Sequence, residues 1–215
     1  MTRDSSRGVA VLAIFLAACA GSGDVFAFGG LGKAFASIVT GNVVVFGYGL
    51  ATDNAALAEP TAAAVAGFIV GATIWAWLLR RRRMALALLV SELLILLAVL
   101  IGWIAAGAHP HRNLTLILLA LVAAAFGGQS VWALRIHQTT TYFTGMVTDA
   151  VNAAVGGSAD RLRTALRQFA ALLAGAVLSG LVLSRLRPAA PALPVLLLGI
   201  AIVVHLRLPP VRGEE

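Results

Sequence analysis

RRRRMALALLVSELLILLAVLIGWIAA (80–106) is the stretch that decides the class of this protein. Four arginines are followed by 23 residues whose apolar character is broken only by Ser91 and Glu92. A helix of about 20 residues crosses a hydrocarbon core of about 30 Å. The stretch therefore predicts a membrane-spanning helix over 84–106. Because arginine clusters remain on the cytoplasmic side, they also predict which end of the helix faces the cytoplasm.

Five further apolar runs resemble this one along the chain. They cover residues 8–28, 61–79, 114–133, 169–184 and 192–206. Hydrophobic residues make up 60% of the 215 residues, charged residues only 12%, and the mean hydropathy is +0.94. Soluble domains are nearer half apolar and a quarter charged, and barrel-forming strands alternate polar and apolar residues. We predict an all-α polytopic membrane protein with about six transmembrane helices.

Two other apolar segments are too short to cross a membrane. Residues 41–51 and 145–155 would each span about 16 Å as helices, and each follows a threonine. Extending the first to residue 57 would make a full span, but only with Asp53 and Asn54 inside it. We therefore predict two re-entrant half-helices, which need shielding by protein or by a water-filled cavity.

The two halves of the chain resemble each other at a fixed offset of 104 residues. The offset pairs Thr40-Gly41 with Thr144-Gly145, Ala66 with Ala170, Gly71-Ala72 with Gly175-Ala176, Arg81 with Arg185, and Arg83 with Arg187. With one residue of slack, Gly23-Asp24 matches Gly128-Gln129. We predict an internal duplication, with repeat 1 over about 8–106 and repeat 2 over about 114–206 in a single membrane domain, 1–215.

The basic residues choose between two topologies. With six crossings and a cytoplasmic N-terminus, twelve basic residues lie inside and only Lys33, Arg112, Arg185 and Arg187 lie outside. With eight crossings, in which both short segments span, the split is eight to eight. The positive-inside rule favours six crossings in a bacterial inner membrane, with the tails 1–7 and 207–215 in the cytoplasm. Three crossings per repeat make the two repeats inverted.

Two longer motifs connect the sequence to a known family. They are GSGDVFAFGGLGKAFASIVTGNVVVFG (21–47) and GGQSVWALRIHQTTTYFTGMVTDAV (127–151). With their T-G-N and T-G-x-x-T-D elements, they resemble the YoaK-like bacterial membrane proteins over essentially the whole chain. This chain has Val25 and Ser130-Val131 where the family usually has small residues. The resemblance implies an integral membrane protein of about six helices and supplies no substrate.

Three carboxylates are candidates for proton or ion coupling. Asp24 lies deep in the first apolar run, Glu92 in the third, and Asp149 in the second short segment beside Thr148 and Asn152. An ionisable group inside a membrane costs about 2.5–3.5 kcal/mol on insertion scales and is a functional hypothesis by default. Each also has a structural interpretation. Asp24 would cap the segment after a helix that ends at Gly23, Glu92 would pair with Gln129 or a threonine, and Asp149 would face solvent.

A second group of residues is predicted to bind the solute. Threonine before glycine suits a helix N-cap, which leaves free N–H groups at the positive end of the helix dipole. Two such ends, converging near the midplane, would bind a polar group or an anion. The predicted set is Thr40, Gly41, Asn42, Gln129, Thr144 and Gly145. The alternative is that the glycines only permit tight turns and close helix contacts.

These features predict a small secondary transporter or channel-like protein for a small polar or anionic solute. The alternative is a non-transporting scaffold or partner-binding subunit whose polar residues hold helices together. We expect no enzyme, because no metalloprotease, P-loop or dinucleotide motif is present. We also expect no metal, no cofactor and no nucleic acid. The expected partners are the lipid bilayer, the solute and a second copy of the chain, since 22.2 kDa leaves a monomer little room for a pathway.

Overall fold

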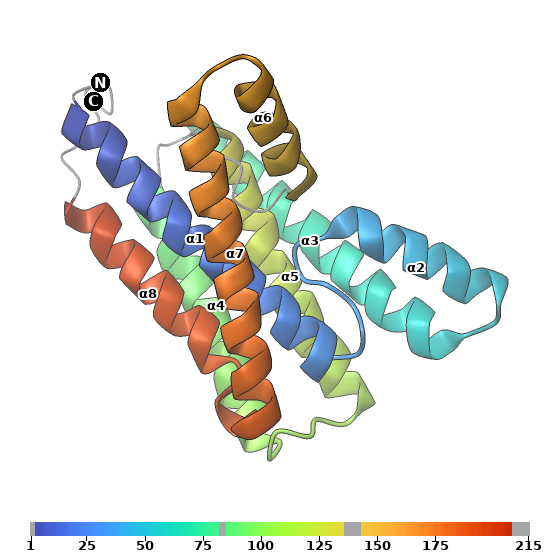
Figure 1. Cartoon of the computed structure of the whole chain (residues 1–215). Coiled ribbons are helices and arrows are strands. Elements are labelled where there is room, and N and C mark those ends of the chain that lie inside the picture. The colour runs from blue at the N-terminus through green and yellow to red at the C-terminus, as the bar shows by residue number, and fades with distance from the viewer. Residues whose placement is uncertain (1–2, 82–84, 136–142, 208–215) are drawn as a thin grey trace.

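The structure is a computed structural model that describes residues 3–81, 85–135 and 143–207, and every regular element in these ranges is a helix (Figure 1). Six helices are long: α1 (Arg3–Gly30), α3 (Ala55–Arg81), α4 (Ala85–Ala105), α5 (Arg112–Arg135), α7 (Ala159–Arg185) and α8 (Ala192–Arg207). Two helices are short, α2 (Val39–Ala51) and α6 (Phe143–Val155), and a 3-10 turn, η1 (Arg187–Ala189), precedes α8.

The six long helices are apolar enough to cross a membrane. The spans are Gly8–Gly30, Ala55–Arg80, Leu86–Ala105, Arg112–Leu134, Ala159–Arg185 and, including η1, Arg187–Arg207. Their outer surfaces carry large apolar side chains, such as Ile69, Trp77, Ile101 and Val177, that are about half exposed or more. Apolar surface on this scale is stable against lipid rather than water. The chain is therefore a multi-pass membrane protein of about six helices, as predicted.

Two spans begin earlier than the apolar runs indicate. α7 begins at Ala159, so the basic residues Arg161, Arg163 and Arg167 form its first turns and do not make a separate surface segment. α3 begins at Ala55, and Asp53 and Asn54 lie in the turn between α2 and α3. The alternative that extends the first short segment to residue 57, which the sequence analysis considered but did not adopt, is therefore wrong.

Glycines bring two pairs of helices into backbone contact. In the α3–α5 pair, a Cβ on Gly71 would overlap the carbonyl oxygen of Ala124, and one on Gly67 that of Ala120. In the α1–α7 pair, a Cβ on Gly175 would overlap the carbonyl oxygen of Ala18. Residue numbers rise together along the α3–α5 contact, so these helices run parallel. Small residues at such crossings allow the close packing that drives helix association in lipid.

The remaining contacts follow the same pattern in both halves of the chain. α2 packs on α3 and α6 packs on α7, while α1 packs on α8 and α4 packs on α5. α4 also packs on α8, which joins the last long helix of each half. Figure 1 shows α2 and the start of α3 projecting sideways from the bundle, and the start of α1 and the end of α8 at one end of it.

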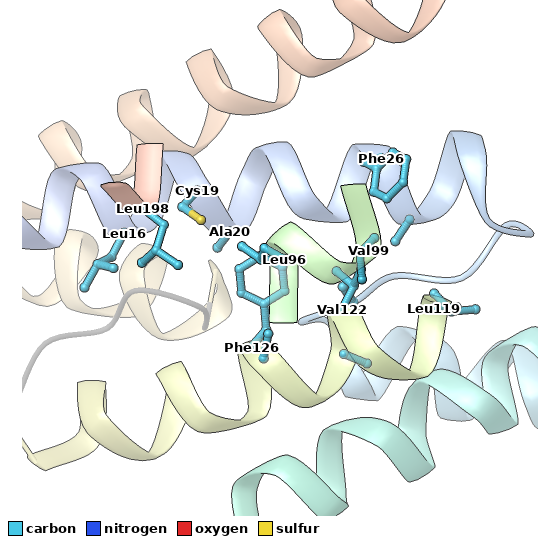
Figure 2. Close-up of a cluster of buried hydrophobic side chains, with 14 of the residues drawn as sticks. Leu16, Cys19, Ala20, Phe26, Leu96, Val99, Leu119, Val122, Phe126 and Leu198 are labelled. Carbon is cyan, nitrogen blue, oxygen red and sulfur yellow. The ribbon is translucent and has the colours of Figure 1, made fainter. Parts of the chain in front are cut away.

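The centre of the bundle is an apolar cluster in which α1, α4, α5 and α8 meet. Leu16, Cys19, Leu96, Phe126 and Leu198 are among its buried side chains (Figure 2). At the end that carries the α4–α5 connection, Trp103 is fully buried and donates through Nε1 to the carbonyl oxygen of Arg187, at 3.0 Å. The Arg187 Nε donates in turn to the carbonyl oxygen of Ala108. These two hydrogen bonds connect α4 and the residues after it to η1, the turn that precedes α8.

Candidate functional site

Asp24 lies inside α1 and holds the segment that comes after this helix. The helix continues to Gly30, so the prediction that it ends at Gly23 is wrong. Gly32 and Lys33 adopt positive φ angles, and the chain turns back along α1. Ser37 then donates its backbone N–H to Asp24 Oδ1 at 2.7 Å and its hydroxyl to Oδ2 at 2.6 Å. Both carboxylate oxygens of Asp24 are therefore used within the protein.

Asn42 has a similar positioning role at the start of α2. Its Oδ1 accepts the backbone N–H of Phe35 at 2.9 Å, and its Nδ2 donates to the carbonyl oxygen of Phe35 at 2.6 Å. Together, Asn42 and Asp24 hold the segment between α1 and α2 in place through their hydrogen bonds to Phe35 and Ser37. Sequence analysis missed Ser37. The only feature of the sequence that could have indicated its role is the position of this serine, in the segment that joins a buried aspartate to a short helix.

The threonines are not helix caps. Thr40 is the second residue of α2, whose N-cap is Ile38, and no side chain caps this helix. Thr144 is likewise the second residue of α6, and its side chain lies outside the described residues. The N-cap prediction for Thr40 is therefore wrong, because the loop that Asp24 and Asn42 hold starts the helix at Val39, two residues earlier than a Thr40 cap requires. Gly41 and Gly145 also lie inside the two short helices.

Glu92 is the most unusual polar residue in the bundle. It is only 2% exposed, and neither carboxylate oxygen has a hydrogen-bond partner among the described residues. The hydrogen bond predicted from Glu92 to Gln129 or a threonine is not found in that part of the chain. Leu96, one turn further along α4, belongs to the apolar cluster (Figure 2), so Glu92 lies next to a fully apolar region.

Gln129, on α5, is a second buried polar residue with an unused acceptor. Its Nε2 donates to the carbonyl oxygen of Leu16 at 3.2 Å, and its Oε1 has no partner in the described part of the chain. Two buried polar side chains, one on α4 and one on α5, therefore have acceptor oxygens without a donor among the described residues. A buried acceptor without a donor costs about 1–3 kcal/mol, and more when it is charged.

Asp149 lies at a cavity of about 690 Å³ between α6 and α7. Asn152, one turn later, lines the same cavity. Arg161 and the buried Gln168 contribute from α7, and Ser158 contributes from the turn between the helices. Asp149 itself is exposed. The predicted site residues therefore fall into three places: the Asp24–Asn42 loop, the Glu92–Gln129 centre and the α6–α7 cavity.

Comparison with known proteins gives a family but no activity. A family model described as "Protein of unknown function (DUF1275)" matches residues 12–204, which is most of the chain. This match agrees with the resemblance to the YoaK-like membrane proteins. No curated protein and no solved structure matches the chain.

Proposed function

The chain belongs to the DUF1275 family, and we propose that it is a small secondary transporter in which Glu92 carries the coupling proton. The solute is small and polar or anionic, and the membrane is the bacterial inner membrane with both chain ends in the cytoplasm. The observation that carries the proposal is the burial of the Glu92 carboxyl group without a hydrogen-bond partner in the described chain.

The physical reason is the cost of an isolated charge in an apolar environment. An ionised carboxylate without a partner loses several kcal/mol of solvation, so it is stable there only with a proton or a cation bound. No other structural need for a carboxylate follows from the contacts of Glu92, since leucine or methionine would fill the same space without this cost. A carboxyl group that is buried despite this loss of solvation is well suited to gain and lose a proton during a transport cycle.

Coupling follows from the charge on Glu92. An anion is repelled by the carboxylate but not by the neutral carboxyl group, so proton and anion occupy the centre together. Gln129, whose amide nitrogen binds the carbonyl oxygen of Leu16, keeps its amide oxygen free and would orient the polar part of the solute. We assign the coupling role to Glu92 rather than Asp24, because both oxygens of Asp24 already accept hydrogen bonds from Ser37.

Inverted repeats would provide the two states that transport requires. The proposal is supported by matching contacts: Gly71 meets Ala124 in the α3–α5 pair, and Gly175 meets Ala18 in the α1–α7 pair. The glycines lie 104 residues apart and the alanines 106. In this proposal, α2 and α6 are re-entrant half-helices, and the residues at their starts, such as Gly41 and Gly145, lie at the solute pathway. Rocking of one repeat against the other then alternates access to the centre.

The test is solute-driven proton movement in proteoliposomes with a pH-sensitive dye inside. A panel of small carboxylates, phosphate, amino acids and sugars is added outside at one pH. An inward gradient of the transported anion should acidify the lumen of vesicles that contain the wild-type protein. Glu92→Gln keeps the shape of the side chain but cannot carry the proton, so acidification should be lost while the protein remains folded.

Glu59→Gln is the matched control, because Glu59 lies at the surface of the start of α3 and pairs with Arg112. This variant should acidify the lumen at the wild-type rate. Acidification by Glu92→Gln at the wild-type rate contradicts the proposal, and so does the lack of any solute-driven pH change with the wild-type protein.

The second candidate function is a non-transporting scaffold. The observation that favours it is that Asp24 and Asn42, two of the nine residues predicted to form the site, make only internal hydrogen bonds. In that case Glu92 is merely a tolerated buried acid. A scaffold gives no flux for any solute, and Glu92→Gln then changes only the thermal stability of the protein.

A further inference from the structure

We propose that the cavity between α6 and α7 binds a zwitterionic group, with its ammonium at Asp149 and its phosphate or carboxylate at Arg161. The cavity volume of about 690 Å³ lies within the range of small-molecule sites, roughly 300–1,000 Å³. This binding goes beyond the proposed function and does not depend on it, because Glu92 does not line the cavity.

The charges in the cavity are held apart. Asp149 comes from α6 and Arg161 from the start of α7, and both line the cavity. Neither forms an ion pair with the other or with any other described residue. A third charged residue, Asp160, also lines the cavity, but it is paired with Arg163. The two opposite charges that stay unpaired match a ligand that carries both charges at separate positions. An ammonium alone or a phosphate alone would leave one of the two charges without a partner.

Neutral polar groups complete the lining. The side chains of Asn152 and Ser158 also make no hydrogen bond to another described residue, and both line the cavity. An amide and a hydroxyl can each donate and accept, so they fit the ester or hydroxyl oxygens between the two charged ends of the ligand. Gln168, only 3% exposed, forms the buried part of the wall on α7.

Unlike Arg161, the nearby Arg163 has an ion-pair partner. Arg163 Nη1 lies 3.3 Å from Asp160 Oδ1, both side chains are largely exposed, and Arg163 does not line the cavity. Arg161 and Arg163 are two residues apart on the same helix and carry the same charge. A comparison of substitutions at these two arginines therefore distinguishes a specific contact in the cavity from a general attraction to the basic start of α7.

Ethanolamine phosphate esters have the proposed chemistry and two sources. One source is the headgroup of phosphatidylethanolamine, since the α6–α7 turn lies at the end of the bundle where α1 begins and α8 ends (Figure 1), and the ends of spanning helices lie near the lipid headgroups. The other is a free molecule such as glycerophosphoethanolamine. Both present a primary ammonium and a phosphate about one ethylene unit apart.

The experiment measures the thermal stability of the purified full-length protein against added ligand. A ligand that binds only the folded state raises the midpoint as its concentration exceeds the dissociation constant. Phosphatidylethanolamine in mixed micelles is compared with phosphatidylglycerol of the same acyl chains, which lacks the ammonium. Glycerophosphoethanolamine is titrated in parallel without lipid. We expect stabilisation by phosphatidylethanolamine and none beyond the micelle effect by phosphatidylglycerol.

Stabilisation by phosphatidylethanolamine alone identifies the source as lipid, and stabilisation by both ethanolamine compounds identifies a site open to free solute. Asp149→Asn and Arg161→Gln should each weaken binding tenfold or more. Arg163→Gln and Asp53→Asn, the latter in the turn between α2 and α3, should leave it unchanged, and so should Glu92→Gln.

Two results overturn the proposal. One is equal stabilisation by phosphatidylglycerol and phosphatidylethanolamine. The other is an equal loss of binding in Arg161→Gln and Arg163→Gln, which would show a surface attraction rather than a site. Proton coupling at Glu92 can fail while this binding persists, so the outcomes of the two proposals remain distinguishable.

Discussion

At the residue scale, three carboxylates that look alike in the sequence have three different environments. Asp24 accepts two hydrogen bonds from Ser37, Glu92 has no partner among the described residues, and Asp149 faces a cavity. Burial of Asp24 and Glu92 could be predicted, because each lies far inside an apolar run. The partner of Asp24 could not be predicted, because it depends on how the chain reverses between residues 30 and 38.

The Asp24–Ser37 contact gives a prediction about stability. Asp24→Asn exchanges one acceptor oxygen for an N–H donor that faces the donors of Ser37, so we expect a loss of about 1–3 kcal/mol. Ser37→Ala removes the hydroxyl that donates to Asp24 Oδ2 and leaves this buried oxygen without a donor, so it should cost about 1.5–3 kcal/mol. Chemical unfolding in detergent measures both changes.

In the double variant, the two losses should be clearly less than additive, because both substitutions break the same contact. Asp53→Asn is the control, since Asp53 lies in an exposed turn at positive φ, a conformation that asparagine tolerates. Fully additive losses would mean that Asp24 and Ser37 act separately.

At the element scale, the sequence predicts the helices better than their ends. The predicted short segments 41–51 and 145–155 correspond to α2 and α6, each of which begins two residues earlier. The largest difference is at α7, which begins ten residues before its apolar run. A run of hydrophobicity locates the part of a helix that lipid surrounds, whereas the helix itself continues into polar sequence as long as nothing breaks it.

Helix crossings give the second prediction. Gly71→Ala and Gly175→Ala each place a methyl group against a backbone carbonyl oxygen of the neighbouring helix. Neither helix can move away without losing its own packing, so we expect each change to cost about 1–3 kcal/mol or more. The measurement is the thermal midpoint in one detergent.

Gly199→Ala in α8 is the matched control, because a Cβ at this position meets nothing within 4 Å. Alanine is also the better helix former, so this variant should be unchanged or slightly more stable. Equal midpoints for Gly71→Ala, Gly175→Ala and Gly199→Ala would show that the two crossings tolerate a wider separation of the helices.

At the scale of the whole molecule, the contacts of one half are matched by those of the other. The packing of α3 on α5 corresponds to that of α7 on α1, and the packing of α2 on α3 corresponds to that of α6 on α7. Sequence analysis could propose the repeat from landmarks such as Gly71 and Gly175. It could not place the α6–α7 cavity, because the cavity depends on how far apart two helices lie.

Topology gives the last prediction, which rests on three crossings in each half. Single cysteines replace Arg80, at the end of α3, and Ser158, in the α6–α7 turn; two others replace Asp53, in the α2–α3 turn, and His109, after α4. The native Cys19 is buried and should give little background. A membrane-impermeant maleimide should label the Asp53 and His109 positions on intact cells, because the proposed topology puts both on the outer side.

The Arg80 and Ser158 positions should be labelled only after permeabilisation, since both belong to the arginine-rich side. If α2 and α6 crossed the membrane completely, eight crossings would place Arg80 and Ser158 on opposite sides. Labelling of one of them from outside and the other from inside would therefore exclude re-entrant helices. Inverted repeats would be excluded with them, because each half would then cross the membrane an even number of times.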